Sequence, residues 1–431
     1  MERLAAKIAM SGAIYAIDRP YDYLVPPELH DTVLPGMRVI VPFGNGNRRT
    51  EGIVLTLGKE CSNRVLKQIF TVLDDTPVLD ENGLKLALWM RGRYFCTVYD
   101  AVKAMLPSGL YYALRDTYRI KQGVDREAAY DAAGQQASAQ RLLHLLYASG
   151  GQADMEQIRS AFGTQNPNST LKMLCGKGIL ELETSAMRGV GDKTEQIATL
   201  LLPPEDAMAQ AAQKRKSAPL RYAVVELLST VGSASAKEIC YFTGASMPTL
   251  RSLEKSGILS LEKQEVFRRV TVDVPEPAGP IVLNEEQTAA FQALNGHLQQ
   301  RKPKASLLYG VTGSGKTQVY IKLIQQARSA GLDAMLLVPE IALTPQMLQV
   351  FSAHFGREIA VLHSALRAGE RYDEWKRIRK GDAHVVIGTR SAVFAPLQNL
   401  GLIILDEEQE YTYKSENMPR YHAREVAKYR C

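Results

Sequence analysis

A glycine-rich segment and an acidic segment are the parts of this sequence best suited to chemistry. Residues 310–317 read GVTGSGKT, and residues 402–408 read LIILDEE. Glycines allow a tight loop whose backbone N–H groups turn inward around phosphates, and the lysine and hydroxyl that follow can reach phosphate and Mg²⁺. A carboxylate at the end of a buried strand can hold the same metal ion. The two segments together predict a binding site for ATP and Mg²⁺.

Each residue of this site has an expected part. Lys316 is expected to reach the β/γ-phosphates, and Thr317 and Asp406 to hold Mg²⁺. Glu407 is placed to polarise the attacking water, so Lys316, Asp406 and Glu407 are the candidate catalytic residues. An apolar stretch precedes the loop and an amphipathic one follows, which makes a chance match in a glycine-rich turn the weaker alternative. The other residues expected to surround the phosphates are Gly310, Gly313, Ser314 and Gly315.

The region around these segments alternates between short apolar runs and helical stretches. Buried strands are predicted at SLLYG, AMLLVP, IAVLHS, HVVIGT and LGLIILD. Stretches such as PQMLQVFSAHF and GERYDEWKRIRKG have helical periodicity and separate the strands. This order predicts a parallel sheet covered by helices, a lobe of the RecA type over residues 276–431. The expected fold class is multidomain α/β.

The first 110 residues have a different pattern, rich in strands and punctuated by Gly and Pro. MRVIVPF and TEGIVLTL alternate and flank a Gly-Asn-Gly-Asn turn, which predicts paired strands, and a helix is predicted at NGLKLALWMRGRYF. Lys7 interrupts the apolar N-terminal stretch, so that stretch is expected to be a first strand and not a signal peptide. Periodicity alone indicates a small β-barrel-like module over residues 1–110.

Two segments in the middle of the chain resemble each other. Each has an apolar helix, a Gly turn, two further short helices and an ending that reads KGILELE or SGILSLE. This order is typical of winged helices, with the final stretch entering a hairpin. We expect the first over residues 111–200, and a linker with the second over 201–275. Contact with DNA and a spacer or protein-contact role are both open for these units.

Composition sets the outer limits. A chain of 431 residues predicts two to four domains, and its 45% hydrophobic and 23% charged residues are ordinary for a globular protein. The net charge of +6 is compatible with a polyanionic partner. Five widely spaced cysteines form no CxxC pair, which favours a reducing compartment over a zinc site or a disulfide framework. We found no apolar run long enough for a membrane span.

Several segments, in order along most of the chain, resemble the PriA (primosomal protein N′) family of replication-restart DNA helicases. They are YDYLVP, GMRVIVPFG, LNEEQ, GVTGSGKT, VPEIALTPQM, LHSAL, GTRSAVFAP and DEEQEYTYKSENMPRYHAREVA. The resemblance implies a cytoplasmic, ATP-dependent DNA helicase that binds forked DNA with a nascent-strand 3′ end and assembles the primosome. Expected partners are single-stranded-DNA-binding protein and primosome proteins, with no membrane partner.

The resemblance also implies roles for residues outside the ATP site. Asp22 and Gly44 correspond to the pocket that captures a 3′ end, and Gln287 to the glutamine that reads adenine. Without the family, Asp22 would be taken for a turn cap. Arg390, within GTRSAVFAP, is expected to contact DNA. The family's aromatic-rich loop, which couples DNA to ATP hydrolysis, matches a segment that includes Tyr411, Tyr413, Lys414, Arg420, Tyr421, His422 and Arg424.

The residues of this loop can be read in two ways. Three tyrosines interleaved with cations could stack bases while the cations neutralise phosphates. Alternatively, the tyrosines could pack on their own lobe. The family resemblance favours the stacking platform.

Two departures from the family pattern change the expectation. Gln409 stands where the family usually has His, so this position cannot titrate. The sequence given ends at Cys431, within the first lobe; the second lobe, its Arg finger and the zinc-binding cysteine clusters of the full-length family are not in it. An Arg finger is typically worth ~10³–10⁵-fold in hydrolysis. We therefore expect DNA and nucleotide binding with poor hydrolysis. The alternatives are an ATP-independent fork-binding or primosome-assembly module, and another helicase-like translocase.

Overall fold

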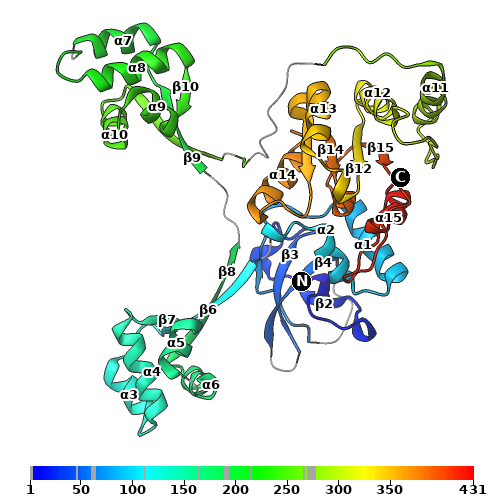
Figure 1. Cartoon of the computed structure of the whole chain (residues 1–431). Helices are drawn as coiled ribbons and strands as arrows, with labels where there is room; N and C mark the ends of the chain where they lie inside the picture. The colour runs from blue at the N-terminus through cyan, green and yellow to red at the C-terminus, as the bar shows by residue number, and fades with distance from the viewer. Residues whose placement is uncertain are drawn as a thin grey trace.

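The computed structural model describes residues 3–44, 47–59, 65–110, 112–163, 165–188, 194–213, 215–265, 267–268 and 278–431. An N-terminal sheet and a C-terminal α/β lobe lie against each other, and two smaller helical units stand away from them (Figure 1). Of the described helices, none is both long enough and apolar enough to cross a lipid bilayer.

The N-terminal domain is built on a five-stranded antiparallel sheet with the order β2-β1-β4-β3-β5. The predicted strand pair is confirmed, because Phe43 of β3 lies opposite Arg48 of β4 across the turn. The predicted helix α1 is also present, and the Asp80 side chain caps it by accepting a hydrogen bond from Gly83 N. The elements are β1 (Leu4–Met10), η1 (Tyr15–Ile17), β2 (Tyr21–Leu24), η2 (Pro27–Leu29), β3 (Arg38–Phe43), β4 (Arg48–Lys59), β5 (Thr71–Val72), α1 (Glu81–Tyr94), α2 (Val98–Met105) and η3 (Ser108–Leu110).

The two middle units share one order of elements, and each has its own hydrophobic core. The first contains β6 (Tyr112–Ile120), α3 (Arg126–Ala133), α4 (Ala137–Ala148), β7 (Gln152–Asp154), α5 (Met155–Phe162), α6 (Asn168–Gly176) and β8 (Leu180–Arg188). The second contains β9 (Thr194–Leu200), α7 (Pro204–Gln213), α8 (Pro219–Val231), β10 (Ser233–Ser235), α9 (Ala236–Thr243), α10 (Met247–Lys255) and β11 (Leu259–Glu265). Capping boxes at Asp154 and Ser235 begin the corresponding helices α5 and α9.

The last strand of each unit does not form the predicted hairpin within the described residues. Instead β8 pairs with β6 and β11 pairs with β9, so each closing strand returns to the strand that opens its unit. Strand β9, which lies N-terminal to the boundary expected at residue 200, thus belongs to the sheet of the second unit. The repeat is longer than the helical pattern indicated, because it includes an opening strand and helix.

The C-terminal lobe holds a parallel sheet with the order β13-β14-β12-β15. Four of the five predicted strands are confirmed. The fifth, at 305–310, forms no described strand pairing: Leu307 and Tyr309 are exposed and only Leu308 packs against the core. The elements are α11 (Glu285–Gln299), α12 (Lys316–Ser329), β12 (Asp333–Leu337), η4 (Glu340–Ala342), α13 (Pro345–Phe355), η5 (Gly356–Glu358), β13 (Ile359–Leu362), α14 (Ala368–Lys380), β14 (Val385–Gly388), η6 (Arg390–Phe394), β15 (Leu400–Leu405), η7 (Tyr411–Tyr413) and α15 (Ala423–Arg430).

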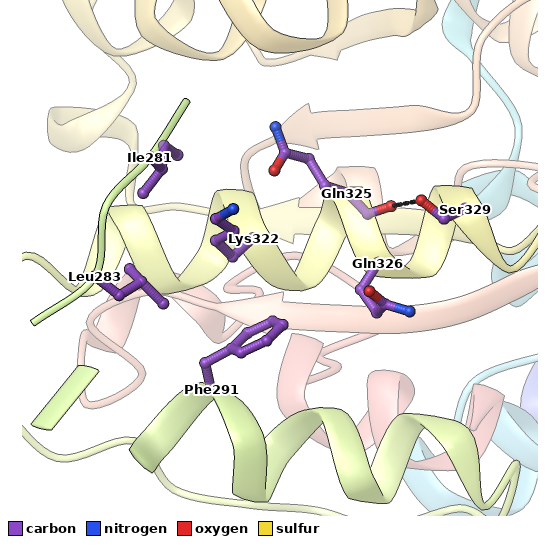
Figure 2. Close-up of a pocket in the computed structure, with 7 residues that line it drawn as sticks. All are labelled: Ile281, Leu283, Phe291, Lys322, Gln325, Gln326 and Ser329. Atoms are coloured by element: carbon purple, nitrogen blue, oxygen red, sulfur yellow. Dashed lines mark hydrogen bonds between the residues drawn. The ribbon is translucent and has the colours of Figure 1, made fainter. Parts of the chain in front are cut away.

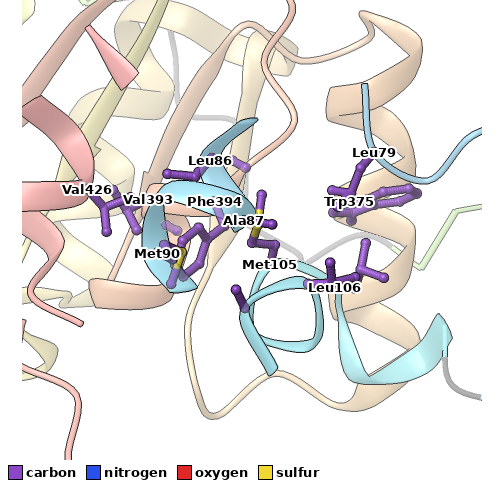
Figure 3. Packing of buried hydrophobic residues seen from close by; sticks show 14 of the residues in the cluster. Leu79, Leu86, Ala87, Met90, Met105, Leu106, Trp375, Val393, Phe394 and Val426 are labelled. Carbon is purple, nitrogen blue, oxygen red and sulfur yellow. The ribbon is translucent and has the colours of Figure 1, made fainter. Parts of the chain in front are cut away.

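The N-terminal domain and the lobe share one hydrophobic core. Side chains of α1 and α2, such as Met90 and Met105, belong to the same buried cluster as Phe394, Trp375 and Val426 of the lobe (Figure 3). At its edge the rings of Trp89 and Tyr429 stack with centroids 4.4 Å apart. This shared core fixes the position of the N-terminal domain relative to the lobe.

Candidate nucleotide and DNA site

The glycine-rich loop has the geometry of a phosphate-binding loop. Helix α12 begins at Lys316, directly after Gly315, and both Gly313 (φ 81°) and Gly315 (φ 79°) adopt left-handed conformations that favour glycine. A Cβ atom on Gly310 would come within 2.8 Å of Ser314 Oγ. The ammonium group of Lys316 donates to Gly310 O at 2.8 Å, inside the loop. These features fit a bound triphosphate at the N-terminus of α12.

The acidic segment lies next to this loop. Asp406 directly follows β15, and its backbone N–H donates to Leu337 O at 2.9 Å. Glu407 Oε1 lies 3.8 Å from Lys316 Nζ, and Glu407 Oε2 accepts a hydrogen bond from Gln409 Nε2 at 2.7 Å. Glu407 has a φ of 45°, a strained conformation for a residue with a side chain. The structure thus brings the predicted catalytic lysine and carboxylates together.

Helix α12 adds a residue that the sequence analysis missed. The Tyr320 hydroxyl donates to Asp406 Oδ1 at 3.0 Å, and Tyr320 lies one helical turn after Thr317. Burial, followed by the negative charge of Asp406, raises the pKa of Tyr320 far above its usual value, so the phenol keeps its proton. The hydroxyl of Thr317 and the carboxylate of Asp406 suit Mg²⁺, which prefers hard oxygen ligands and usually keeps several waters.

Gln287 supports the loop in this structure. Its amide nitrogen Nε2 donates to Ser314 O at 3.0 Å, and its Oε1 accepts from Asn284 N at 3.0 Å in a capping box at the start of α11. Phe291, one turn further on, lines a hollow of about 520 Å³ between α11 and α12 (Figure 2). The hollow is lined by Ile281, Leu283, Phe291, Lys322, Gln325, Gln326 and Ser329.

The predicted three-tyrosine stacking platform is wrong in this structure. Tyr411 is 79% exposed, but Tyr413 is 1% exposed and Tyr421 is 5% exposed. The Tyr413 hydroxyl lies 2.7 Å from Asp406 O and 2.9 Å from Leu337 O, and the Tyr421 ring packs edge-on against Phe394. Two of the three tyrosines therefore pack on their own lobe, which was the alternative reading. Tyr411 is the tyrosine of this set that remains accessible to a base.

The cations near this loop divide into supporting and exposed groups. The guanidinium of Arg390 donates to Thr412 O at 3.1 Å and to Lys414 O at 2.6 Å, so it braces the loop. Lys414 Nζ donates to Arg420 O at 2.6 Å, and both Lys414 and Arg420 are exposed. Arg390 thus holds in position the loop that presents these two cations and Tyr411.

The predicted 3′-end residues belong to different strands of the N-terminal sheet: Asp22 lies in β2 and Gly44 directly follows β3, with β1 and β4 between these strands in the sheet order. Asp22 is half-exposed in β2 and pairs with Lys7, which lies directly opposite in β1, at 3.2 Å. It sits within a strand, which removes the turn-cap reading. Gly44 follows β3 with a φ of 69°, and its carbonyl accepts from Lys67 Nζ at 2.7 Å.

Three further residues, Tyr21, Phe43 and Lys67, shape this region. The rings of Tyr21 and Phe43 meet edge-on with centroids 5.2 Å apart, which joins the strands that carry Asp22 and Gly44. Lys67 has no motif around it in the sequence, so only the fold could identify it. Tyr21 could have been found from its place beside Asp22.

Comparisons with known proteins agree with this geometry. The model of the 3′ DNA-binding domain (3′BD) of PriA matches residues 7–107, and the model of DEAD/DEAH box helicases matches residues 284–428. The chain therefore joins a DNA-binding domain to a helicase lobe.

Similar proteins along almost the whole chain indicate which helicase family this chain resembles. The chain is 34% identical to the Replication restart protein PriA of Bacillus subtilis over 98% of this chain and 51% of that protein. It is 42% identical to that of Chlamydia muridarum over 99% and 47%, and 31% identical to that of Synechocystis sp. over 95% and 48%. The chain belongs to the PriA family, as the resemblance implied, and spans about half the length of the curated relatives it matches.

The residues that the structure describes contain no cluster of side chains that could form a structural zinc site. Within them no group of three or more His, Cys, Asp or Glu side chains is arranged to hold a metal ion. The Mg²⁺ site considered above needs no such group, because Mg²⁺ usually binds through one or two carboxylates, waters and the phosphates of its substrate.

Proposed function

We propose that this chain supplies the DNA-end-binding domain and one ATPase lobe of an ATP-dependent DNA helicase that acts in replication restart. The shared hydrophobic core carries this proposal, because it joins the domain that would hold DNA to the lobe that would hold ATP. At this junction Lys414, from the loop after the acidic segment, lies 5.8 Å from the ring centroid of Tyr94 in α1. A DNA end bound by the N-terminal domain would then be held in a fixed position relative to the ATP site, because the domain and the lobe share one hydrophobic core.

In the nucleotide site, each side chain would act from its observed position. Lys316 would exchange the carbonyl of Gly310 for phosphate oxygens, and Thr317 and Asp406 would hold the metal ion. Mg²⁺ would neutralise charge on the phosphates as the terminal phosphoryl group is transferred to water. Glu407 would orient that water and accept its proton, and Gln409 would hold one Glu407 oxygen through an amide that does not titrate. Gln287 uses one amide hydrogen toward Ser314 O and one lone pair toward Asn284 N, so its second hydrogen and second lone pair would read adenine.

The DNA contacts would divide between the two parts. Asp22 would accept a hydrogen bond from a terminal 3′-OH, and Gly44 would let the backbone approach the sugar. In the lobe, Tyr411 would stack on a base while Lys414 and Arg420 neutralise phosphates. The substrate would be forked DNA with a nascent-strand 3′ end in the cytoplasm, and family resemblance suggests primosome proteins and single-stranded-DNA-binding protein as partners.

Nucleotide titration tests the ATP site. We expect the parent chain to bind a fluorescent ATP analogue and Lys316→Ala to lose this binding, because the phosphates lose their main cationic partner. Lys322→Ala, a change on the same helix away from the loop, is the matched control and should bind normally. Equal affinity in the parent chain and Lys316→Ala would overturn the assignment.

Measuring ATP hydrolysis with and without forked DNA distinguishes the proposed ATP-dependent helicase from an ATP-independent DNA-binding module. Stimulation by the fork supports a motor lobe coupled to DNA. Fork binding without stimulated hydrolysis favours the ATP-independent fork-binding or primosome-assembly module. The match of the PriA 3′ DNA-binding domain to residues 7–107 argues against an unrelated translocase.

A further inference from the structure

Asp406 is held by hydrogen bonds at several atoms. Its backbone N–H donates to Leu337 O at 2.9 Å, and its carbonyl oxygen lies 2.7 Å from the Tyr413 hydroxyl. Its carboxylate oxygen Oδ1 accepts from the Tyr320 hydroxyl at 3.0 Å. The first two contacts fix the main chain at the end of β15, whereas the contact with Tyr320 controls the side chain.

The contact with Tyr320 engages one of the two carboxylate oxygens of Asp406 and leaves the other available. A hydrogen bond from a neutral donor to a charged acceptor is stronger than one between neutral groups, so Oδ1 is held on the side of α12. Oδ2 then remains for a metal ion. Thr317, the expected second metal ligand, lies one turn before Tyr320 on α12, so the two hydroxyl groups share one side of this helix.

The surroundings of Tyr320 explain why this orientation would persist. The side chain is 7% exposed, and its ring belongs to the core formed by α12 and the central strands. A ring packed in this way has little freedom to move its hydroxyl group. A phenol has a pKa of about 10, so at neutral pH the hydroxyl of Tyr320 is a donor.

We infer that Tyr320 is a positioning residue. It orients the Asp406 carboxylate so that one oxygen is available to bind Mg²⁺. This inference rests on the proposed nucleotide-binding function. Partners that orient a metal ligand typically change metal affinity by about 10–100-fold when they are removed. The effect of losing the hydroxyl should therefore appear in the Mg²⁺ requirement and not in the packing of the lobe.

The test is Tyr320→Phe in the full chain, which removes the hydroxyl and keeps the ring. Binding of a fluorescent ATP analogue is titrated first without metal and then with increasing Mg²⁺. We expect unchanged affinity without metal and a rise of about tenfold or more in the Mg²⁺ concentration for half-maximal enhancement. Tyr23→Phe is the matched control, because Tyr23 is also buried and its hydroxyl donates to Pro42 O at 3.1 Å; its Mg²⁺ requirement should equal that of the parent.

A second variant distinguishes direct coupling from a general weakening of the lobe. In an Asp406→Asn background, Tyr320→Phe should cause little further change, because contacting residues are non-additive. An unchanged Mg²⁺ requirement in Tyr320→Phe, or fully additive effects, would overturn the inference while leaving the proposed function intact. If the parent chain shows no Mg²⁺-dependent nucleotide binding, the proposed function fails and the inference fails with it.

Discussion

Replacing Tyr413 should destabilise the lobe, whereas replacing Tyr411 should not. Tyr413 is 1% exposed, so Tyr413→Ala leaves a cavity of aromatic size, which costs about 3–5 kcal/mol. Loss of the hydroxyl also removes the contact at 2.7 Å with Asp406 O, at a net cost of roughly 1 kcal/mol. We therefore expect Tyr413→Ala to lower the free energy of unfolding by about 4–6 kcal/mol. Tyr411 is 79% exposed, and Tyr411→Ala should stay within about 0.5 kcal/mol of the parent.

Intrinsic fluorescence during urea denaturation measures this difference. The sequence has two tryptophans, Trp89 and Trp375, and both lie in or against the shared core that contains Tyr413. Their fluorescence emission thus reports the unfolding of the shared core around Tyr413. Tyr413→Phe keeps the ring and should lose roughly 1 kcal/mol, so this variant measures the contribution of the hydroxyl separately from that of the ring.

Equal stabilities of Tyr413→Ala and Tyr411→Ala would refute this reasoning. That result would mean that Tyr413 is not buried and that the stacking platform deserves a second test. If the expected difference is found, Tyr413→Ala cannot serve as a test of DNA contact, because it disturbs the backbone next to Asp406.

Four further outcomes are expected. Tyr411→Ala should leave nucleotide binding intact and reduce DNA stimulation of ATP hydrolysis, measured in a chain that shows such stimulation; full stimulation would make Tyr411 a passive surface residue. DNA with a free 3′-OH should bind better than DNA with a 3′-phosphate, and Asp22→Ala should reduce this preference; equal binding of both ends would remove the end-capture role. Binding of single-stranded DNA should weaken as salt rises, with a log–log slope of about −0.7 per phosphate contact. Burial raises the pKa of Tyr421 to about 12, whereas an unfolded phenol ionises near 10, so its stabilising contribution is complete below pH 10 and is lost as the pH rises through 12. Alkaline denaturation of Tyr421→Phe should accordingly show a shallower loss of stability over that range, and an identical slope would contradict the assignment.

Local patterns in the sequence determined the elements that carry the ATP site. The glycines of GVTGSGKT permit left-handed turns without a steric cost, and Gly313 and Gly315 adopt them. The strand pair around residues 44–47, helix α1 and four strands of the parallel sheet follow from periodicity and turn chemistry within short windows. These features need no knowledge of distant residues, which is why the sequence was sufficient.

Contacts between distant residues decided the rest. Tyr413 is buried by the shared core, where its hydroxyl contacts Leu337 O, 76 positions away, although its segment alone looks like an exposed aromatic loop. The same holds for Tyr320, whose partner Asp406 lies 86 positions along the chain. The shared core also depends on α1 meeting α15, since an apolar helix face does not specify the surface that will cover it. The sequence thus determined which elements form and which chemistry they carry, whereas tertiary packing decided which side chains support the site and which remain free to meet DNA.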